Sequence, residues 1–567
     1  MSKIIECVPN FSEGTDQTKI NSIVSSIKSI QSVTVLDCDP GLDTNRTVVT
    51  FVGEPDSVIE AAFQGIKCAS ELIDMSQHKG THTRIGATDV CPIIPVNGVS
   101  IGECIEYSII LAKKVGLELN IPVYLYEKSA ISPSRENLAS IREGEYEGLE
   151  QKLKDKNWKP DFGPTKFNKS AGATVIGCRE FLIAYNINLN TTDKRLATDI
   201  AFEIRQAGRS KRKKNPHSSN LLDGEIIRHK NGAPIKVPGK FKFVKAIGWY
   251  VSEYNRAQVS INFTNYKISP IHQVFDTVCG LAFERGLRVT GSELVGLIPK
   301  SALIDAGKYY LKKQGRSLGV PESDIIECAV QSLGLNDVSK FNTKQKIIEF
   351  AIEDKKDSLL HLTTDDLIQS ISQNSPAPGG GSVSALAGAL GAALLSMVSL
   401  LTYDKKEYLS RRIKMSRLGE MAHKYQKRLK ELVDEDTHAF DSVMNASRLP
   451  EKAKLEAKFK KQELFKAYKI ATDTPLEIAI ISLEIIKLSI DLIKYGNLNS
   501  VTDAHVAAEV GLAGVRGGCV NVMINLSSFD KISDYDAKIE EKIEGLLKDS
   551  NRLHRKAFTL TKKIIKE

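Results

Sequence analysis

The stretch SPAPGGGSVSALAGALGAALLSMVSLL, residues Ser375–Leu401, decides how the C-terminal part of the chain is interpreted. It begins with two prolines and three glycines, and no charged residue occurs from Val383 to Leu401. A run of about 20 apolar residues is long enough to cross a membrane. A glycine-rich turn before a helix also presents bare backbone N–H groups to an anion. The stretch is therefore a membrane span, a phosphate loop or a buried helix.

The composition of this stretch favours a buried helix. Five alanines, three serines and two glycines between Val383 and Leu401 make it weakly apolar for a membrane span, and small residues let helices pack closely. No Lys-Ser/Thr pair follows the glycines, which disfavours a nucleotide phosphate loop. We predict a tight turn, a closely packed helix and a candidate ligand loop made of Gly379, Gly380, Gly381 and Ser382.

The segments that follow have helical periodicity. Apolar residues recur at spacings of three and four in Ser410–Ser447, Thr474–Gly496 and Ser500–Leu526, and strand-like patterns are absent from about Lys344 onward. We therefore predict an all-α helical bundle over residues 346–567.

The N-terminal part has a different pattern. Short β-rich runs such as KIIECVPNF and SVTVLDCD alternate with helical segments such as PDSVIEAAFQGIKCASELI up to about residue 330. This mixture predicts two tandem α+β subdomains, residues 1–180 and 181–330, each a sheet with helices on one face. Residues 331–345 are the predicted linker to the bundle.

Composition limits the cellular setting. The 567 residues include nine cysteines, which occur singly and without a CxxC pair, so neither a zinc ribbon nor a disulfide framework is indicated. The N-terminus MSKIIECVPNFSEG does not have the pattern of a secretory signal. We expect a cytoplasmic protein.

The net charge of +9 is concentrated in one segment. Residues 209–214 carry five positive charges within six positions, inside a Gly- and Pro-containing segment of about residues 209–240. The pattern is typical of an exposed basic loop inserted into a domain, and the alternative is a landing surface for a polyanion. No aromatic residue interleaves the basic run, which disfavours nucleic-acid binding.

Two histidines lie four residues apart in HKGTHTRIGATDVCP, residues His78–Pro92. Glycines and threonines within this span disfavour a helix, and no acidic third ligand is close in sequence, so zinc binding is disfavoured. Two alternatives remain for His82: a loop histidine held by hydrogen bonds, or a general base. Arg84 and Asp89 are candidates for orienting a carboxylate substrate or the ring.

Three further segments contain candidate functional groups. LDCDPGLDTNRTVVTF places Asp37, Asp39 and Asp43 in a predicted turn, as structural residues or as carboxylates facing a cationic substrate. PDFGPTKFNKSAGATVIGCREF is a Gly-rich loop without a Walker ending. ELVDEDTHAF holds Asp434 and Asp436 on a helix, as a solvated face or as a proton-shuttling carboxylate with a raised pKa.

The longest motifs resemble known enzymes. CVPNFSEG, HTRIGATDVCPIIPV and GATVIGCREFLIAYNINL resemble glutamate formimidoyltransferase. APGGGSVSALAGALGAAL, LVDEDTHAF and GNLNSVTDAHVAAEVG resemble formimidoyltetrahydrofolate cyclodeaminase. Their order is similar to the bifunctional formimidoyltransferase-cyclodeaminase family over nearly the whole chain. The basic segment near residues 209–240 is the main departure from the family pattern.

The resemblance implies two consecutive reactions of histidine degradation. The first transfers the formimino group of N-formimino-L-glutamate to N5 of tetrahydrofolate and releases glutamate. The second closes the ring to 5,10-methenyltetrahydrofolate and releases ammonia. It also implies a homo-oligomer with polyglutamylated tetrahydrofolate as co-substrate, and we expect no metal, no nucleic-acid partner and no membrane span. The alternatives are a folate-binding scaffold with one activity lost and a nucleic-acid-binding protein.

The resemblance also implies residue roles. His82 matches the transferase general base, and Asp436 matches the cyclodeaminase acid/base. Asp39 would stabilise the cationic formimino group, while Arg46 and Arg84 are candidates for substrate carboxylates. The folate-binding loop matches Gly163, Pro164, Thr165, Lys166, Phe167, Asn168, Lys169, Ser170, Ala171 and Gly172.

Overall fold

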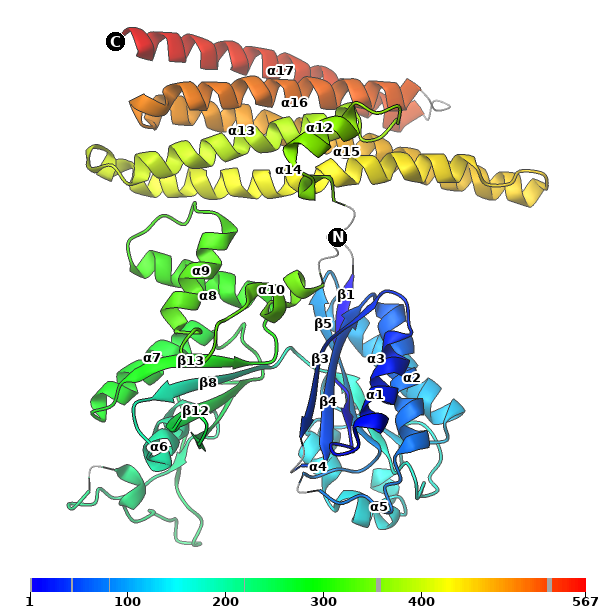
Figure 1. Ribbon diagram of the computed structural model, residues 1–567, viewed down its shortest axis with the longest axis vertical. Helices are drawn as coiled ribbons and strands as arrows, with labels where there is room; N and C mark the ends of the chain where they lie inside the picture. Colours follow the sequence, from blue (N-terminus) through cyan, green and yellow to red (C-terminus); the bar gives the residue numbers. More distant parts are fainter. Residues whose placement is uncertain (1–2, 42–43, 81, 219, 353–357, 528–532) are drawn as a thin grey trace. The chain divides into compact units, whose positions relative to one another are not determined.

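The computed structural model describes residues 3–41, 44–80, 82–218, 220–352, 358–527 and 533–567. The chain forms two compact units. The first comprises Met1–Ala306 with Val330–Glu353, and the second comprises Gly307–Ala329 with Asp354–Glu567. The first unit holds the described sheets, two large ones and the two-stranded β9–β10 pair, and the second unit is helical (Figure 1).

The first sheet has seven strands in the order β1-β4-β2-β5-β7-β6, with β3 paired to β4. Its strands are β1 (Ile4–Cys7), β2 (Asn10–Phe11), β3 (Val33–Gly41), β4 (Arg46–Gly53), β5 (Thr88–Asn97), β6 (Val123–Leu125) and β7 (Thr174–Cys178). The β5–β7 and β6–β7 pairs are parallel, and the other pairs are antiparallel. The alternation of buried residues along β4 reflects one covered face.

Three helices cover one face of this sheet (Figure 1). They are α1 (Gln17–Lys28), α2 (Pro55–Leu72) and α3 (Ile101–Glu118). Pro55 occupies the first helical position of α2, where its missing N–H costs nothing. A capping box of Ser100 and Glu103 begins α3. Short helices α4 (Leu138–Arg142) and α5 (Glu145–Lys152) follow β6.

The second sheet has four antiparallel strands in the order β11-β12-β8-β13. They are β8 (Ile183–Leu189), β11 (Val244–Val251), β12 (Arg256–Phe263) and β13 (Val289–Val295), and helices α6 (Lys194–Ile204) and α7 (Ile271–Glu284) pack on the sheet. Helices α8 (Lys300–Lys313), α9 (Glu322–Leu333), α10 (Thr343–Lys346) and α11 (Ile348–Ala351) follow. Two sheet-plus-helix subdomains, as predicted, are confirmed.

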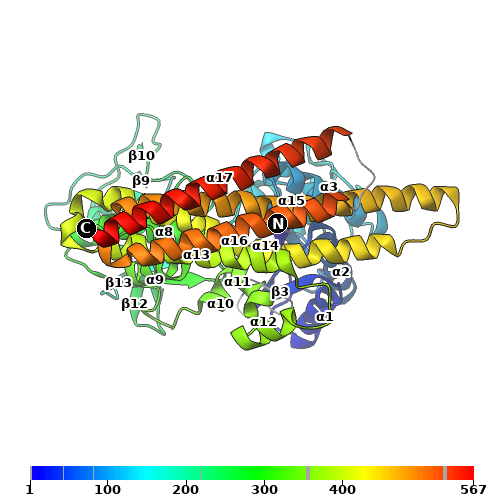
Figure 2. The same ribbon diagram turned by 90° about the horizontal axis from the view of Figure 1, so that it is seen from above.

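The second unit is built from long helices that lie side by side (Figure 2). They are α13 (Gly380–Tyr403), α14 (Arg412–Ser447), α15 (Lys454–Tyr495), α16 (Val501–Ser527) and α17 (Ser533–Lys566), preceded by α12 (Thr364–Ile371). Alanine, leucine and isoleucine residues of α13–α16 form a common core. The predicted helical region is therefore confirmed.

Helix α13 contains the stretch Val383–Leu401 and packs against α14, α15 and α16. Its glycines allow this, because a Cβ at Gly388 would lie 2.8 Å from Ser482 Oγ and one at Gly391 would lie 2.9 Å from Val510 Cγ2. Gly380–Tyr403 and Leu498–Ser527 are each long and apolar enough to cross a membrane, but 56% and 50% of their apolar windows are buried in the structure. Buried core helices meet the same criterion, so the two helices are weak evidence for a span.

The segment Gly307–Ala329 clusters with the helical unit, although the sequence assigns it to the second sheet subdomain. Tyr403 Oη donates to Gly315 O at 2.9 Å, and Leu318 N donates to Ser416 Oγ at 3.0 Å. These bonds attach the α8–α9 connection to α13 and α14. The residue boundaries of the predicted subdomains and linker stay predictions.

Candidate active sites

The β3–β4 hairpin places Asp39 beside Arg46. Asp39 pairs with Val48 and Gly41 pairs with Arg46 in the strand register, so Asp39 and Arg46 are diagonal neighbours. Asp39 is exposed. The segment is extended strand rather than the predicted turn up to Gly41, and Asp43 lies outside the described residues. The hairpin therefore carries an anionic and a cationic side chain at one end.

His82 contacts Arg46 and is held in one tautomer. Its Nδ1 lies 2.7 Å from Thr83 O, which only accepts, so Nδ1 carries the proton. Its Nε2 therefore has the lone pair and accepts from Arg46 Nη1 at 2.7 Å. A guanidinium cannot accept a hydrogen bond, so the contact requires neutral imidazole.

The surroundings of His82 keep the ring neutral. Burial lowers the pKa of His82, and the cations of Arg46 and Arg142 lower it further, against opposing contributions from Thr83 and Asp89. The pKa of Arg46 is lowered by burial as well, while Asp89 and Asp39 raise it. His82 is therefore arranged as a base that is free of its proton near neutral pH.

Asp89 and Arg142 form a buried ion pair behind this group. Arg142 Nη2 donates to Asp89 Oδ2, and Ile85 N donates to Asp89 Oδ1 at 3.1 Å. Asp89 is fully buried. Arg142 comes from α4, 60 positions beyond His82, and no local pattern in the sequence connects the two.

The other predicted cation, Arg84, already has acidic partners. Arg84 Nη2 donates to Glu147 at 2.7 Å, and Nη1 donates to Glu145 at 3.0 Å. Its Nε donates to His78 Nδ1 at 3.3 Å, and His78 Nε2 donates to Asn45 O at 3.0 Å. His78 is thus a loop histidine held on both nitrogens. Arg84 is thus already paired with two carboxylates, and the roles of Arg46 and Arg84 toward a substrate stay predictions.

The loop Gly163–Gly172 joins the segment that carries His82. Met75 N donates to Ser170 O, and Ala87 N donates to Ala171 O, both at 2.9 Å. Gly172 has φ +68°, and a Cβ there would lie 2.2 Å from Ile85 O, so only glycine permits this close approach. Lys166 and Lys169 are exposed, which leaves both ammonium groups available to an anionic ligand.

In the helical unit, Asp436 of α14 lies at the N-terminus of α13. Ser382 Oγ donates to Asp436 Oδ2 at 3.2 Å and is 3.2 Å from Thr437 Oγ1. The carboxylate packs on the bare Cα of Gly381, where a Cβ would lie 2.1 Å from Oδ1. The predicted loop and the predicted acid thus form one site.

Two opposing effects act on Asp436. Burial raises its pKa, and the side-chain and backbone hydrogen bonds from Ser382 lower it, with a raised pKa as the result. Asp434, two positions earlier, accepts from Ser358 Oγ at 2.7 Å and from Leu359 N at 2.8 Å. Asp434 therefore caps a short helical turn, and Asp436 is the carboxyl that can exchange a proton.

One neighbour of this site was not predicted from the sequence. Asn521 of α16 lies beside Gly380: a Cβ at Gly380 would be 3.5 Å from Asn521 Nδ2. Asn521 lies about 140 positions after the glycines in the sequence. The glycine motif alone therefore does not indicate this neighbour. Among the described residues, no three His, Cys, Asp or Glu side chains are grouped so that they could hold a metal ion.

Comparison with protein families matches three consecutive parts of the chain. Residues 4–179 match the model "Formiminotransferase domain, N-terminal subdomain" and residues 184–353 match "Formiminotransferase domain". Residues 363–545 match "Formiminotransferase-cyclodeaminase".

Curated proteins resemble the chain at full length and in part. Formimidoyltransferase-cyclodeaminase of Mus musculus is 40% identical over 97% of this chain and 97% of that protein. Glutamate formimidoyltransferase of Streptococcus pyogenes serotype M1 is 41% identical, over 55% of this chain and 94% of that protein. Methenyltetrahydrofolate cyclohydrolase of Methylorubrum extorquens is 32% identical, over 35% of this chain and 96% of that protein.

Proposed function

Because the chain belongs to the formimidoyltransferase-cyclodeaminase family, we propose that its two units catalyse consecutive steps on tetrahydrofolate. The first unit transfers the formimino group from N-formimino-L-glutamate to N5. The helical unit closes the product to 5,10-methenyltetrahydrofolate and releases ammonia. The observation that carries this proposal is the pair of proton-exchanging groups, neutral His82 in the first unit and Asp436 with its raised pKa in the second.

In the transfer step, N5 of tetrahydrofolate attacks the formimino carbon, and the bond from that carbon to the glutamate nitrogen breaks. N5 loses a proton, and the glutamate nitrogen gains one. His82 Nε2 takes the first proton because Nδ1 is already protonated toward Thr83. The same nitrogen can return the proton to the leaving amine.

Arg46 has two roles in this proposal. In the structure it donates to the lone pair of His82 Nε2, which blocks proton transfer. A substrate carboxylate that pairs with the guanidinium draws it away from Nε2. The charge of Asp39 raises the pKa of Arg46. In the proposed reaction the Asp39 carboxylate stabilises the protonated formimino group. Substrate binding and activation of the base are then coupled through one side chain.

The pH dependence of transfer tests this arrangement. Transfer needs neutral His82, so kcat/KM falls as pH decreases through its pKa. That pKa is lowered, so the acidic limb is expected below the ordinary pKa of His, about 6.5. Arg46→Gln removes one cation, raises the pKa and should shift the limb to higher pH. A limb that does not move in this variant would contradict the role of Arg46 in keeping the ring neutral.

In this proposal the folate-binding loop Gly163–Gly172 contributes to the affinity for folate and takes no part in proton transfer. Its exposed Lys166 and Lys169 are suited to the glutamate carboxylates of the folate tail. Tyr146 Oη donates to Lys169 O at 2.5 Å, which holds the backbone of the loop. We propose that polyglutamylated tetrahydrofolate is the preferred form, because a longer tail brings more carboxylates to these lysines.

In the second step, N10 attacks the carbon of the protonated formimino group, and the bond from that carbon to the terminal nitrogen breaks. Ammonia leaves only after this nitrogen gains a proton. Asp436 donates it, since its raised pKa keeps a larger fraction protonated, and then accepts the proton lost by N10. The N–H groups beginning α13 suit a folate carboxylate.

Gly381→Ala is expected to abolish ring closure while leaving transfer intact. The new Cβ would lie 2.1–2.5 Å from three carboxyl atoms of Asp436, so the carboxyl group must move. A displaced acid loses its alignment with the leaving nitrogen. Gly545→Ala is a matched control, because within the described structure no heavy atom outside its own stretch of helix lies within 4 Å of its Cβ position. Equal loss in both variants would contradict the role of the contact between Gly381 and Asp436.

One coupled assay tests the proposed function as a whole. The chain is mixed with N-formimino-L-glutamate and tetrahydrofolate, and methenyl absorbance and ammonia are followed together. Both should increase. Release of glutamate without methenyl absorbance would instead support the alternative, a folate-binding protein that has lost one activity.

The setting of the enzyme completes the proposal. We place it in histidine degradation in the cytoplasm, where nine free cysteines remain reduced, with no nucleic-acid partner and no membrane span. Self-association is supported by exposed apolar residues on α13 and α16, among them Leu390 at 55% and Val520 at 59% exposure. Sedimentation of the full chain tests the oligomer.

A further inference from the structure

The basic segment is folded against the second subdomain instead of forming only a solvated loop. Strands β9 (Arg209–Ser210) and β10 (Lys236–Val237) pair, Lys211 N donates to Ile235 O, and Ile227 N donates to Lys211 O. Lys211 and Lys213 are exposed, whereas Arg209 and Arg212 are partly buried. Alternation along an extended chain places Arg212 on the side opposite Lys211 and Lys213. The prediction of an exposed basic loop therefore holds only for the lysines.

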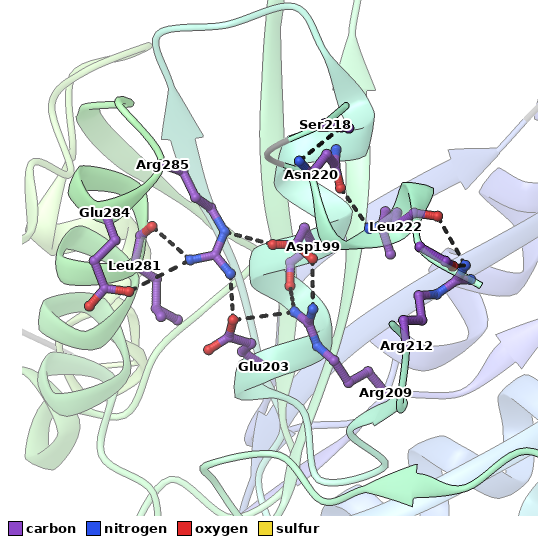
Figure 3. A network of polar contacts seen from close by, with 11 residues as sticks. Asp199, Glu203, Arg209, Arg212, Ser218, Asn220, Leu222, Leu281, Glu284 and Arg285 are labelled. Atoms are coloured by element: carbon purple, nitrogen blue, oxygen red, sulfur yellow. Dashed lines mark hydrogen bonds and ion pairs between the residues drawn. The ribbon is translucent and has the colours of Figure 1, made fainter. Parts of the chain in front are cut away.

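Arg209 belongs to an ion cluster, shown in Figure 3. Arg209 Nη1 donates to Asp199 Oδ1 at 2.8 Å, and Arg285 Nε donates to Asp199 Oδ2 at 2.6 Å. Glu203 is within ion-pair distance of both arginines. Glu284 is a third carboxylate, 3.9 Å from Arg285, so the positive charge of Arg209 is compensated within this cluster.

A cavity of about 190 Å³ lies next to this cluster. It is lined by Phe202, Arg205, Arg209, Ser210, Arg212, Leu222 and Lys236. Within the described part of the chain, no carboxylate forms an ion pair with Arg205, Arg212 or Lys236. The two acidic residues of the segment are paired elsewhere, Asp223 with Arg195 and Glu225 with Lys213. Three positive charges around the cavity are thus uncompensated.

The arginines at this cavity also have unused donors. Arg209 Nε is buried and has no hydrogen-bond partner in the described structure. Arg205 donates through Nε to Gly208 O at 2.9 Å, and its guanidinium lies 3.9 Å from the centre of the Phe202 ring. Arg212 donates through Nη1 to Leu222 O and Gly224 O. Backbone carbonyls hold these two guanidinium groups in place without neutralising them, which is a preorganised anion site.

We propose that this cavity binds a compact oxyanion carrying at least two negative charges. Its volume equals that of about six water molecules at about 30 Å³ each, and it is below the range of about 300–1,000 Å³ for larger ligands. The cavity therefore fits a phosphate-sized group or the two carboxylates of a terminal glutamate, and is too small to enclose a whole nucleotide or folate. Burial and the charge of Arg209 lower the pKa of Arg205. A bound anion stabilises the charged guanidinium and so raises this pKa again. None of the lining residues belongs to the two proposed active sites.

Calorimetric titration of the full chain tests the proposal. Inorganic phosphate and free triglutamate are the two probes, because both offer the required chemistry from different sources. Saturable binding of either probe that depends on Arg205 and Arg212 is expected, and the tighter probe at this site identifies the source. Arg205→Gln and Arg212→Gln should each weaken that binding at least about tenfold, since each removes a charged hydrogen-bond donor. Transfer and ring closure at saturating substrate should be unchanged.

Lys211→Gln is the matched control, because it removes one positive charge of the same segment from an exposed side chain outside the cavity. Its affinity should stay within about twofold of the unsubstituted chain, as expected for a screened surface charge. Equal weakening in all three variants would show diffuse attraction and overturn the proposal. Absence of saturable binding of both probes to the unsubstituted chain would also overturn it, whether or not the variants fold.

Discussion

His82→Gln is expected to lower the kcat of formimino transfer by about 10²–10⁴, the usual contribution of a general base. Glutamine can still bond to Thr83 O and Arg46, the two partners of the imidazole, but its amide does not take up a proton near neutral pH. The loss should therefore appear in kcat more than in KM. Ring closure, assayed directly with 5-formimidoyltetrahydrofolate, should keep its rate, because Asp436 belongs to the other unit.

The matched control is His78→Gln in the same loop. Both ring nitrogens of His78 are engaged, one with Asn45 O and one with Arg84 Nε, so this residue positions the loop. We expect a lower melting temperature and a decrease in transfer of about tenfold or less. A loss in His78→Gln as large as in His82→Gln would refute the assignment of the base.

The fold was largely predictable because each unit has a strong local pattern. Apolar spacing of three and four residues identifies α14 and α15, and short alternating runs identify the strands. Helix α13 is less obvious, since its length also fits a membrane span. A Cβ at two of its glycines would come too close to Ser482 or Val510, so α13 is a packed core helix. These two neighbours lie on other helices, and the sequence of α13 alone does not reveal the contacts.

The candidate site residues could be named from the sequence only where one motif holds them, and their roles stay predictions. His82 and Asp436 each lie in a single long motif. The contact from Arg46 to His82 and the charge of Arg142 join segments that the sheet brings together, and spacing along the chain does not encode them. Arg84 shows what spacing leaves out: its position beside His82 suggests a substrate cation, and the structure adds that Glu145 and Glu147 on α5 pair with it.

Asp436→Asn is expected to lower the rate of ring closure by about 10²–10⁴ while leaving transfer unchanged. The amide oxygen still accepts from Ser382 Oγ, so the site keeps its shape, but the amide has no acidic proton for the leaving nitrogen. Supplied with N-formimino-L-glutamate and tetrahydrofolate, the variant should release glutamate and accumulate 5-formimidoyltetrahydrofolate without methenyl absorbance. Chromatography of the reaction mixture measures both.

Asp434→Asn and Asp441→Asn distinguish chemistry from structure on the same helix. Asp434 caps the turn at Ser358 and Leu359, so its loss should lower the melting temperature yet preserve ring closure below it, because capping contributes about 1 kcal/mol. Asp441 is exposed and should be neutral in both measurements. If Asp434→Asn stopped ring closure in folded protein while Asp436→Asn did not, the proton donor would be Asp434. The site at Gly381 and Ser382 would then have a binding role only.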